Sequence, residues 1–156
     1  MTKPSVLFVC LGNICRSPLA EAAFRAEAKR IGLEVEVDSA GTGGWHVGEP
    51  PDHRAQAEAR RHGVDISGYR ARKVSRDDFR RFTHILVLDS ENLRDLKRLM
   101  PPGATAELSL LLDHVPGREG EAVADPWYGG PADFEITWSD VAAAAAALAK
   151  ELAERP

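Results

Sequence analysis

The feature that most constrains this chain is a segment near its start that passes from a strand through a short loop into a helix. An apolar run over 5–9 predicts a buried strand, and Cys10 follows at its end. Ser17 and Pro18 are typical of the N-cap and the first position of a helix. Backbone N–H groups of the loop between them can point into one hollow, to which the helix adds partial positive charge. The segment therefore predicts a site for a tetrahedral anion such as phosphate.

Two reactive side chains lie at the ends of this loop, because five residues separate Cys10 from Arg16. A free cysteine has a pKa of about 8.5, which falls to roughly 3.5–7.5 at a helix N-terminus or beside arginine. The planar guanidinium of Arg16 can hold two phosphate oxygens at once. We therefore expect a nucleophilic sulfur at the floor of an anion cradle.

The string from Val9 to Pro18, VCLGNICRSP, resembles the active-site signature of the low-molecular-weight protein tyrosine phosphatases. The resemblance covers nearly the whole chain and implies one α/β domain over 1–156. That domain would be a three-layer αβα sandwich, whose four-stranded parallel sheet has the order 2-1-3-4. It also implies hydrolysis of phosphotyrosine through a phosphocysteine intermediate, with inorganic phosphate as product and neither cofactor nor metal. In the phosphate-binding loop after the first strand, the resemblance places Leu11, Gly12, Asn13, Ile14, Cys15 and Ser17.

Length and composition fit this reading and exclude several classes of protein. The 156 residues suffice for one domain with a core, and a net charge of −4 gives no electrostatic footprint for nucleic acid. No apolar run reaches the length of a membrane span, and the first residues show no signal-peptide pattern. Two cysteines five positions apart do not form a secreted disulfide framework. We expect a cytoplasmic enzyme, a monomer or weak dimer, that acts on phosphotyrosine-containing proteins or peptides.

Strands that alternate with helices predict a parallel sheet covered on both faces. We expect strands over 5–9, 35–37, 84–89 and 108–112, and helices over 19–31, 54–62, 75–82, 91–100 and 134–152. Ligands of such folds bind beyond the carboxyl ends of the strands, where Cys10 and Asp89 lie. Asp89 or Ser90 is also suited to cap the helix that follows.

An acid that protonates the leaving group is expected in the long loop over 116–131. A phenol has a pKa near 10, so its departure is helped by a positioned acid. Asp125 lies in this loop before Pro126 and Trp127, and an Asp-Pro pair alone usually indicates a turn. The family carries an Asp-Pro-aromatic motif before its last helix, and this resemblance implies that Asp125 is the general acid.

The resemblance also assigns supporting roles around the loop. It implies that Asn13 holds the loop conformation, that the hydroxyl of Ser17 donates to the thiolate, and that Ser39 supports the loop. Relatives often carry a histidine where this chain has Tyr69, before Ala71. We therefore expect the bracing of Asn13 to differ here.

Three aromatic side chains are candidates for the substrate wall. Trp45, Trp127 and Tyr128 lie in loops rich in glycine and proline, where a large ring has little core to fill. Together they could form a slot that stacks on a phenyl ring.

The second cysteine of the loop has two interpretations. From the residues alone, Cys15 is a buried, inert thiol. The resemblance implies instead a reversible disulfide between Cys10 and Cys15 that protects the nucleophile from over-oxidation. The five histidines are not spaced with the cysteines as in a zinc finger, so we expect no metal site.

Other functions are compatible with parts of this pattern. Protein arginine phosphatases place a threonine where this chain has Ile14, whose branched apolar side chain favours an aryl ester. Arsenate reductases share the loop, but their redox relay needs further cysteines, and none follows Cys15. A non-catalytic phosphate-binding module could lose the nucleophile or the acid, whereas Cys10 and Asp125 are both present. The Gly-x4-Gly-Lys pattern of a nucleotide P-loop is absent.

Overall fold

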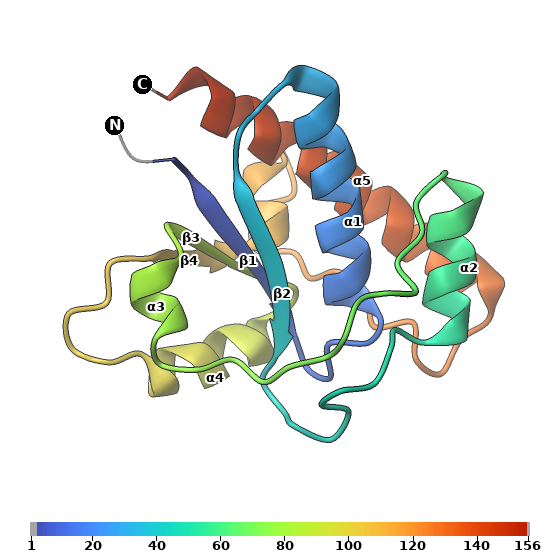
Figure 1. Cartoon of the computed structure of the whole chain (residues 1–156), viewed down its shortest axis with the longest axis horizontal. Coiled ribbons are helices and arrows are strands. Elements are labelled where there is room, and N and C mark those ends of the chain that lie inside the picture. The colour runs from blue at the N-terminus through green and yellow to red at the C-terminus, as the bar shows by residue number, and fades with distance from the viewer. Residues whose placement is uncertain (1–2, 156) are drawn as a thin grey trace.

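The computed structural model describes residues 3–155, in which four parallel strands lie between two layers of helices (Figure 1). The strands are β1 (Ser5–Cys10), β2 (Glu36–Gly41), β3 (His84–Val87) and β4 (Glu107–Leu110). The helices are α1 (Arg16–Ile31), α2 (His53–Arg61), α3 (Asp78–Arg81), α4 (Ser90–Leu99) and α5 (Pro131–Glu154), with a 3-10 turn, η1 (Leu111–His114).

The sheet has the order β2-β1-β3-β4, which confirms the predicted topology. β1 is a central strand that pairs in parallel with β2 on one side and with β3 on the other. Its residues Val6–Val9 are fully buried, because helices cover both faces of the sheet. Burial on both faces of the sheet explains why β1 is a continuous apolar run in the sequence.

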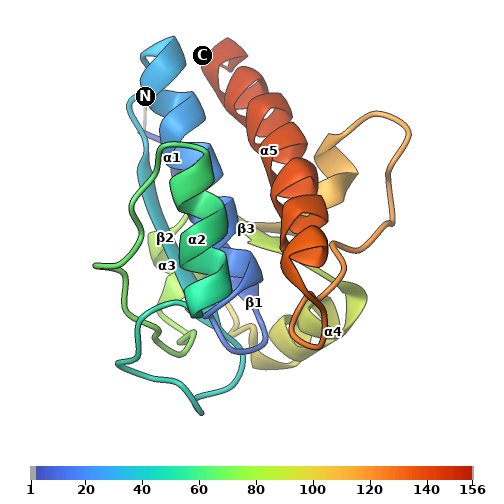
Figure 2. The same ribbon diagram turned by 90° about the vertical axis from the view of Figure 1, so that its right-hand side faces the viewer.

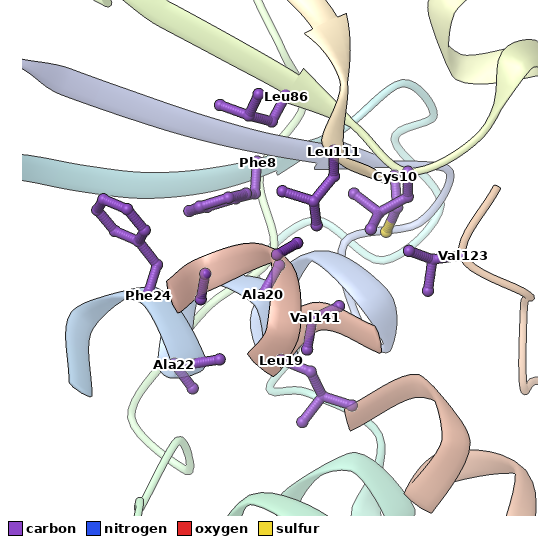
Figure 3. Packing of buried hydrophobic residues seen from close by; sticks show 14 of the residues in the cluster. Phe8, Cys10, Leu19, Ala20, Ala22, Phe24, Leu86, Leu111, Val123 and Val141 are labelled. Atoms are coloured by element: carbon purple, nitrogen blue, oxygen red, sulfur yellow. The ribbon is translucent and has the colours of Figure 1, made fainter. Parts of the chain in front are cut away.

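Each face of the sheet has its own hydrophobic cluster. On one face, Phe8 and Leu86 belong to a cluster with residues of α1 and α5, and Figure 3 shows the Phe8 ring beside that of Phe24, with centroids 5.6 Å apart. On the other face, apolar residues of β1 and β3 pack against α3 and α4. In Figure 2, α1, α2 and α5 lie together in front of the sheet, with α2 against α5. The two clusters fix the sheet, and the loops at its carboxyl edge emerge from this rigid base.

The start of α1 differs from the prediction. The helix begins at Arg16, so Ser17 lies within its first turn, and Cys15 occupies the N-cap position without a side-chain cap. The prediction of Ser17 as N-cap and Pro18 as first helical residue is therefore wrong. The reason is that the Ser17 hydroxyl faces Cys10 instead of the free N–H groups of the helix.

The apolar run predicted as a strand over 108–112 divides into two elements. Pairing between β3 and β4 ends at Leu110, and η1 then carries Leu111 and Leu112 into the core beneath α5. The strand predicted over 35–37 extends instead from Glu36 to Gly41, because pairing with β1 continues to Cys10.

The other elements lie close to their predicted ranges. The helix predicted over 75–82 is shorter and begins at Asp78, whose carboxylate accepts a hydrogen bond from the Ser75 N–H. Asp89 caps α4 by accepting from the Asn92 N–H, as expected. Of the helices within residues 3–155, none combines the length and apolar character that crossing a bilayer requires.

The buried face of α5 supplies a test of this packing. Leu148 is fully buried, whereas Ile136 on the same helix is 57% exposed. Replacing Leu148 with alanine should lower the free energy of unfolding by about 2–5 kcal/mol, because it leaves a cavity in the core. Ile136→Ala should change that free energy by no more than about 0.5 kcal/mol. Urea denaturation measures both, and equal midpoints for the two variants would contradict the described face of α5.

Candidate active site

The residues predicted to bind phosphate lie between β1 and α1, at the ends toward which the arrows of β1 and β2 point in Figure 1. Cys10 is the last residue of β1 and Arg16 the first of α1, and each is only 3% exposed. Figure 3 shows the Cys10 sulfur at the edge of the core, near Leu111 and Val123. The nucleophile candidate thus stands on a rigid strand, with a helix N-terminus directed at the same space.

A cavity of about 280 Å³ opens above this loop. It brings together residues from the start, the middle and the end of the chain. Its lining comprises Cys10, Leu11, Gly12, Ile14, Cys15, Arg16, Trp45, His46, Asp125, Trp127 and Tyr128. All three predicted catalytic residues and all three predicted wall residues therefore border one cavity, while Asn13, Ser17 and Ser39 lie outside its lining.

Asn13 holds the loop in its curved shape. Its φ of 59° is left-handed, and within residues 3–155 no other residue except glycine has a positive φ. Its Nδ2 donates to Ser17 Oγ at 2.8 Å and to Ser39 Oγ at 3.0 Å, and its Oδ1 accepts from the Arg72 N–H at 3.0 Å. A left-handed conformation costs an L-residue roughly 1–2 kcal/mol, which these three hydrogen bonds offset.

The Ser17 hydroxyl links this brace to the sulfur. Ser17 Oγ lies 3.0 Å from Cys10 Sγ, and both side chains are buried. Because a thiolate can only accept, the hydroxyl is the donor whenever Cys10 is ionised. One side chain therefore supports the loop and also lies within hydrogen-bond distance of the sulfur.

Behind Ser39 the hydrogen-bond chain ends in a buried carboxylate that the sequence did not reveal. Ser39 Oγ donates to Glu21 Oε1 at 2.7 Å, and Arg25 Nε donates to Glu21 Oε2 at 2.8 Å. Burial raises the pKa of Glu21 above its ordinary value, although the hydrogen bonds from Ser39 and Arg25 partly lower it. Helical spacing from Ser17 to Glu21 and Arg25 is the only sequence signal that could have indicated this pair.

Tyr69 lies at the position where relatives often carry histidine, and it does not brace Asn13. Within the described part of the chain, no hydrogen bond joins the two side chains. The main-chain N–H of Arg72 donates to Asn13 Oδ1 instead. Tyr69 is half-buried against the core. Burial, followed by the nearby Glu21 carboxylate, raises the pKa of Tyr69 to about 12, so its hydroxyl is neutral at physiological pH.

Arg16 is oriented by two fixed acceptors. Its Nη1 donates to Asp89 Oδ2 at 2.7 Å and to the Val123 carbonyl at 3.0 Å. Burial lowers the pKa of Arg16, but the Cys10 sulfur and the Asp89 carboxylate outweigh this effect and raise it above its ordinary value. The guanidinium is therefore always charged, and its orientation is set before any phosphate arrives. The sequence placed Asp89 at this edge of the sheet but gave it no role toward Arg16.

Asp125 faces this loop from the segment before α5. Its Oδ2 lies 3.8 Å from Arg16 Nη2, and its Oδ1 accepts from the Trp127 N–H at 3.1 Å, which makes a turn closed by the side chain. The carboxyl group is 46% exposed and borders the cavity. This placement suits a group that must reach a substrate atom and also exchange a proton with water.

The rim of the cavity is aromatic and open to solvent. Trp45 is 70% exposed, Trp127 38% and Tyr128 98%, so none of these rings serves the core. His46, which directly follows Trp45, also borders the cavity, with its ring centroid 6.2 Å from that of Trp127.

Cys10 and Cys15 are both free thiols. Burial, and then the charges of Asp52, Cys10 and Asp125, raise the pKa of Cys15 far above its ordinary value, so this thiol stays protonated at neutral pH. The disulfide implied by the resemblance remains a prediction. Across residues 3–155, no three His, Cys, Asp or Glu side chains are placed to share one metal ion.

Comparison with known proteins shows which family this chain resembles. The family described as low molecular weight phosphotyrosine protein phosphatase matches residues 5–156. This chain belongs to that family. A family member from Schizosaccharomyces pombe is 46% identical over 138 residues, which are 86% of this chain and 88% of that protein. The chain is thus a low molecular weight protein tyrosine phosphatase, an enzyme that acts on phosphoproteins.

Solved structures of relatives share the fold over nearly the whole chain. The crystal structure of YfkJ from Bacillus subtilis has a TM-score of 0.91 at 39% identity and covers 99% of this chain and 97% of its own. The crystal structure of a Drosophila arginine phosphatase has a TM-score of 0.88 at 31% identity and covers 94% of this chain and 96% of its own. The phosphatase fold is therefore common to proteins named for two different phosphoryl substrates.

The left-handed conformation of Asn13 generates a test in this phosphatase. Asn13→Ala should lower the free energy of unfolding by about 2–4 kcal/mol, because alanine is strained at this φ and makes none of the three hydrogen bonds. Asn13→Gly should recover part of that loss, because glycine adopts positive φ freely. Urea denaturation of both variants measures the difference. If alanine and glycine proved equally stable, the strain at residue 13 would be refuted.

Proposed function

We propose that Cys10 is the nucleophile, Arg16 the phosphate-orienting cation and Asp125 the general acid in the hydrolysis of phosphotyrosine. The observation that carries this proposal is that all three side chains border one cavity, with the Cys10 sulfur beside the Ser17 hydroxyl at the start of α1. A thiolate, a fixed guanidinium and a partly exposed carboxyl group are the groups that transfer of a phosphoryl group to sulfur requires.

In the first step, the Cys10 thiolate attacks phosphorus, so that an S–P bond forms while the bond to the tyrosine oxygen breaks. Asp125 gives its proton to the departing phenolate oxygen. Arg16 and the N–H groups of the loop hold the three remaining oxygens, whose charge the N-terminus of α1 also stabilises. The products of this step are tyrosine and a phosphocysteine.

In the second step, water attacks the phosphorus of the phosphocysteine. Asp125 is now ionised and takes a proton from that water, which makes it the general base. The S–P bond breaks, inorganic phosphate leaves, and Cys10 is again a thiolate that accepts from Ser17. No group outside the chain is consumed except the water.

The rim supports phosphotyrosine as the substrate. Trp45, Trp127 and Tyr128 offer flat apolar surfaces on which a phenyl ring can stack, and the branched side chain of Ile14 adds an apolar contact. A shorter phosphoserine leaves those surfaces unused. The likeness to a Drosophila arginine phosphatase supports phosphoarginine as the second candidate, against which Ile14 argues because it lacks a hydroxyl group. An arsenate reductase and a non-catalytic phosphate-binding module rank below both.

The partner is a phosphotyrosine-containing segment of a protein. One chain contains the proposed nucleophile, cation and acid around one cavity, so the proposed chemistry is compatible with a monomer or a weak dimer. Because Cys10 acts only as a free thiol, a reducing compartment suits the enzyme, and we infer that it works in the cytoplasm.

The acid role of Asp125 predicts a dependence on the leaving group. Asp125→Ala should lower kcat/KM for phenyl phosphate by about 100-fold or more, because phenolate leaves poorly without a proton. The loss should be several-fold smaller for p-nitrophenyl phosphate, whose leaving group needs little protonation. Cys10→Ser should abolish turnover of both. Steady-state kinetics on the two esters checks this, and equal losses would exclude Asp125 as the acid.

The proposed substrate class predicts that the enzyme prefers phosphotyrosine peptides to phosphoarginine peptides. Matched peptides that carry phosphotyrosine or phosphoarginine should be hydrolysed at rates that differ by at least about tenfold in favour of phosphotyrosine, since one lost apolar contact in a pocket changes rates by roughly 10–200-fold. Ile14→Thr should bring the hydrolysis rates of the two peptides closer together. Phosphate release from each peptide gives the rates, and a preference of the wild type for phosphoarginine would overturn the substrate assignment.

A further inference from the structure

The loop that carries Asp125 is tied to the end of a strand before the acid, and the side chain of Arg54 contacts its main chain after the acid. Before Asp125, the Val123 N–H donates to the Leu88 carbonyl at 2.8 Å, which ties the loop to the end of β3. After it, residues 126–129 turn away across the rim of the cavity. Within residues 3–155, Arg54 is the one side chain that donates hydrogen bonds to carbonyl oxygens of this turn.

Arg54 contacts both the main chain of this turn and the aromatic ring of Trp127. Its Nη1 donates to the carbonyls of Trp127 and Gly129, each at 3.0 Å. Its guanidinium carbon also lies 5.6 Å from the ring centroid of Trp127 and 4.8 Å from that of Phe134. One planar cation therefore contacts two carbonyls and one ring of the loop, and also one ring of α5.

Arg54 is itself anchored to the phosphate-binding loop through Asp52. Its Nε and Nη2 donate to the two carboxylate oxygens of Asp52 at 3.0 and 3.1 Å. Burial raises the pKa of Asp52, but the hydrogen bonds from Arg54 outweigh burial and hold that pKa below its ordinary value. The Asp52 N–H donates to the Ile14 carbonyl at 2.9 Å. A continuous path of hydrogen bonds thus runs from the phosphate-binding loop to the loop of the acid.

We propose that Arg54 is a positioning residue that sets the distance between the general acid and the phosphate-binding loop. The inference rests on the proposed role of Asp125. A general acid must lie within hydrogen-bond reach of the leaving oxygen while the nucleophile attacks, and a misplacement of about 1 Å can cost about 100-fold in rate. Arg54 supplies this control because it joins the two loops that carry Asp125 and Ile14.

The hydrogen bonds of Arg54 argue against direct binding of the substrate phosphate. A guanidinium has five N–H donors. Four hydrogen bonds, two to carbonyls of the acid loop and two to Asp52, leave only one donor free. A bidentate grip on a phosphate would require Arg54 to release its present acceptors.

The test compares two esters in variants of the full chain. Arg54→Gln should lower kcat/KM for phenyl phosphate by about tenfold or more and for p-nitrophenyl phosphate by less than about threefold, since only the first needs a well-placed acid. In the Asp125→Ala background, Arg54→Gln should have no further effect beyond about twofold, because the group that it positions is absent. Arg54→Lys should fall between, since an ammonium keeps the charge but lacks the planar fork.

A matched control separates this role from a loss of charge or of folding. Arg60 lies exposed on the same helix, and Arg60→Gln removes the same charge. It should leave both kcat/KM values unchanged. The inhibition constant of inorganic phosphate should also be unchanged in Arg54→Gln, which shows that the phosphate-binding loop is intact.

The outcomes distinguish the two proposals. Equal losses on both esters, or losses that add to those of Asp125→Ala, would overturn the positioning role and assign Arg54 to substrate binding or to folding. If Asp125→Ala itself showed no dependence on the leaving group, the acid assignment would fail, and the role of Arg54 would fall with it. A loss confined to phenyl phosphate and absent without Asp125 would support both.

Discussion

The site depends on the backbone of Asn13, which adopts a left-handed conformation that its own side chain maintains. An L-residue enters this region only when its surroundings compensate the strain. Here the compensation comes from α1 through Ser17, from β2 through Ser39 and from a distant loop through Arg72. Three separate elements thus hold the curvature of the phosphate-binding loop through the side chain of Asn13.

The order of the strands explains how those elements meet. β1 occupies a central position, so its carboxyl end has β2 on one side and β3 on the other. In parallel register, Ser39 lies opposite Phe8, two residues before Cys10, and its hydroxyl reaches the side chain of Asn13 in the loop. Asp89 follows β3 and reaches Arg16 from the opposite side. The site therefore lies where strand order reverses, and each neighbour contributes one supporting side chain.

The sheet order was predicted from a resemblance that covers nearly the whole chain, and the strand-loop-helix unit was predicted from local sequence patterns. They failed where a contact joins distant segments. The brace from Arg72 spans 59 positions, and the clamp from Arg54 to Trp127 spans 73, so no local pattern indicates either. The predicted cap at Ser17 failed for a related reason, because its hydroxyl takes a tertiary partner in place of the local one.

Two aspartates flank Arg16, and their surroundings separate their roles. Asp89 is 22% exposed and accepts from both Arg16, at 2.7 Å, and the first turn of α4, so each of its oxygens has a fixed donor. Asp125 is 46% exposed, lies 3.8 Å from the same guanidinium and belongs to a loop. A carboxylate whose two oxygens each accept from a fixed donor is held in place, whereas a more exposed carboxylate with fewer fixed donors can reach both a substrate atom and solvent. The surroundings of Asp89 therefore suit a fixed anion that orients Arg16, and those of Asp125 suit the proposed general acid, whose position the proposed contacts of Arg54 would set.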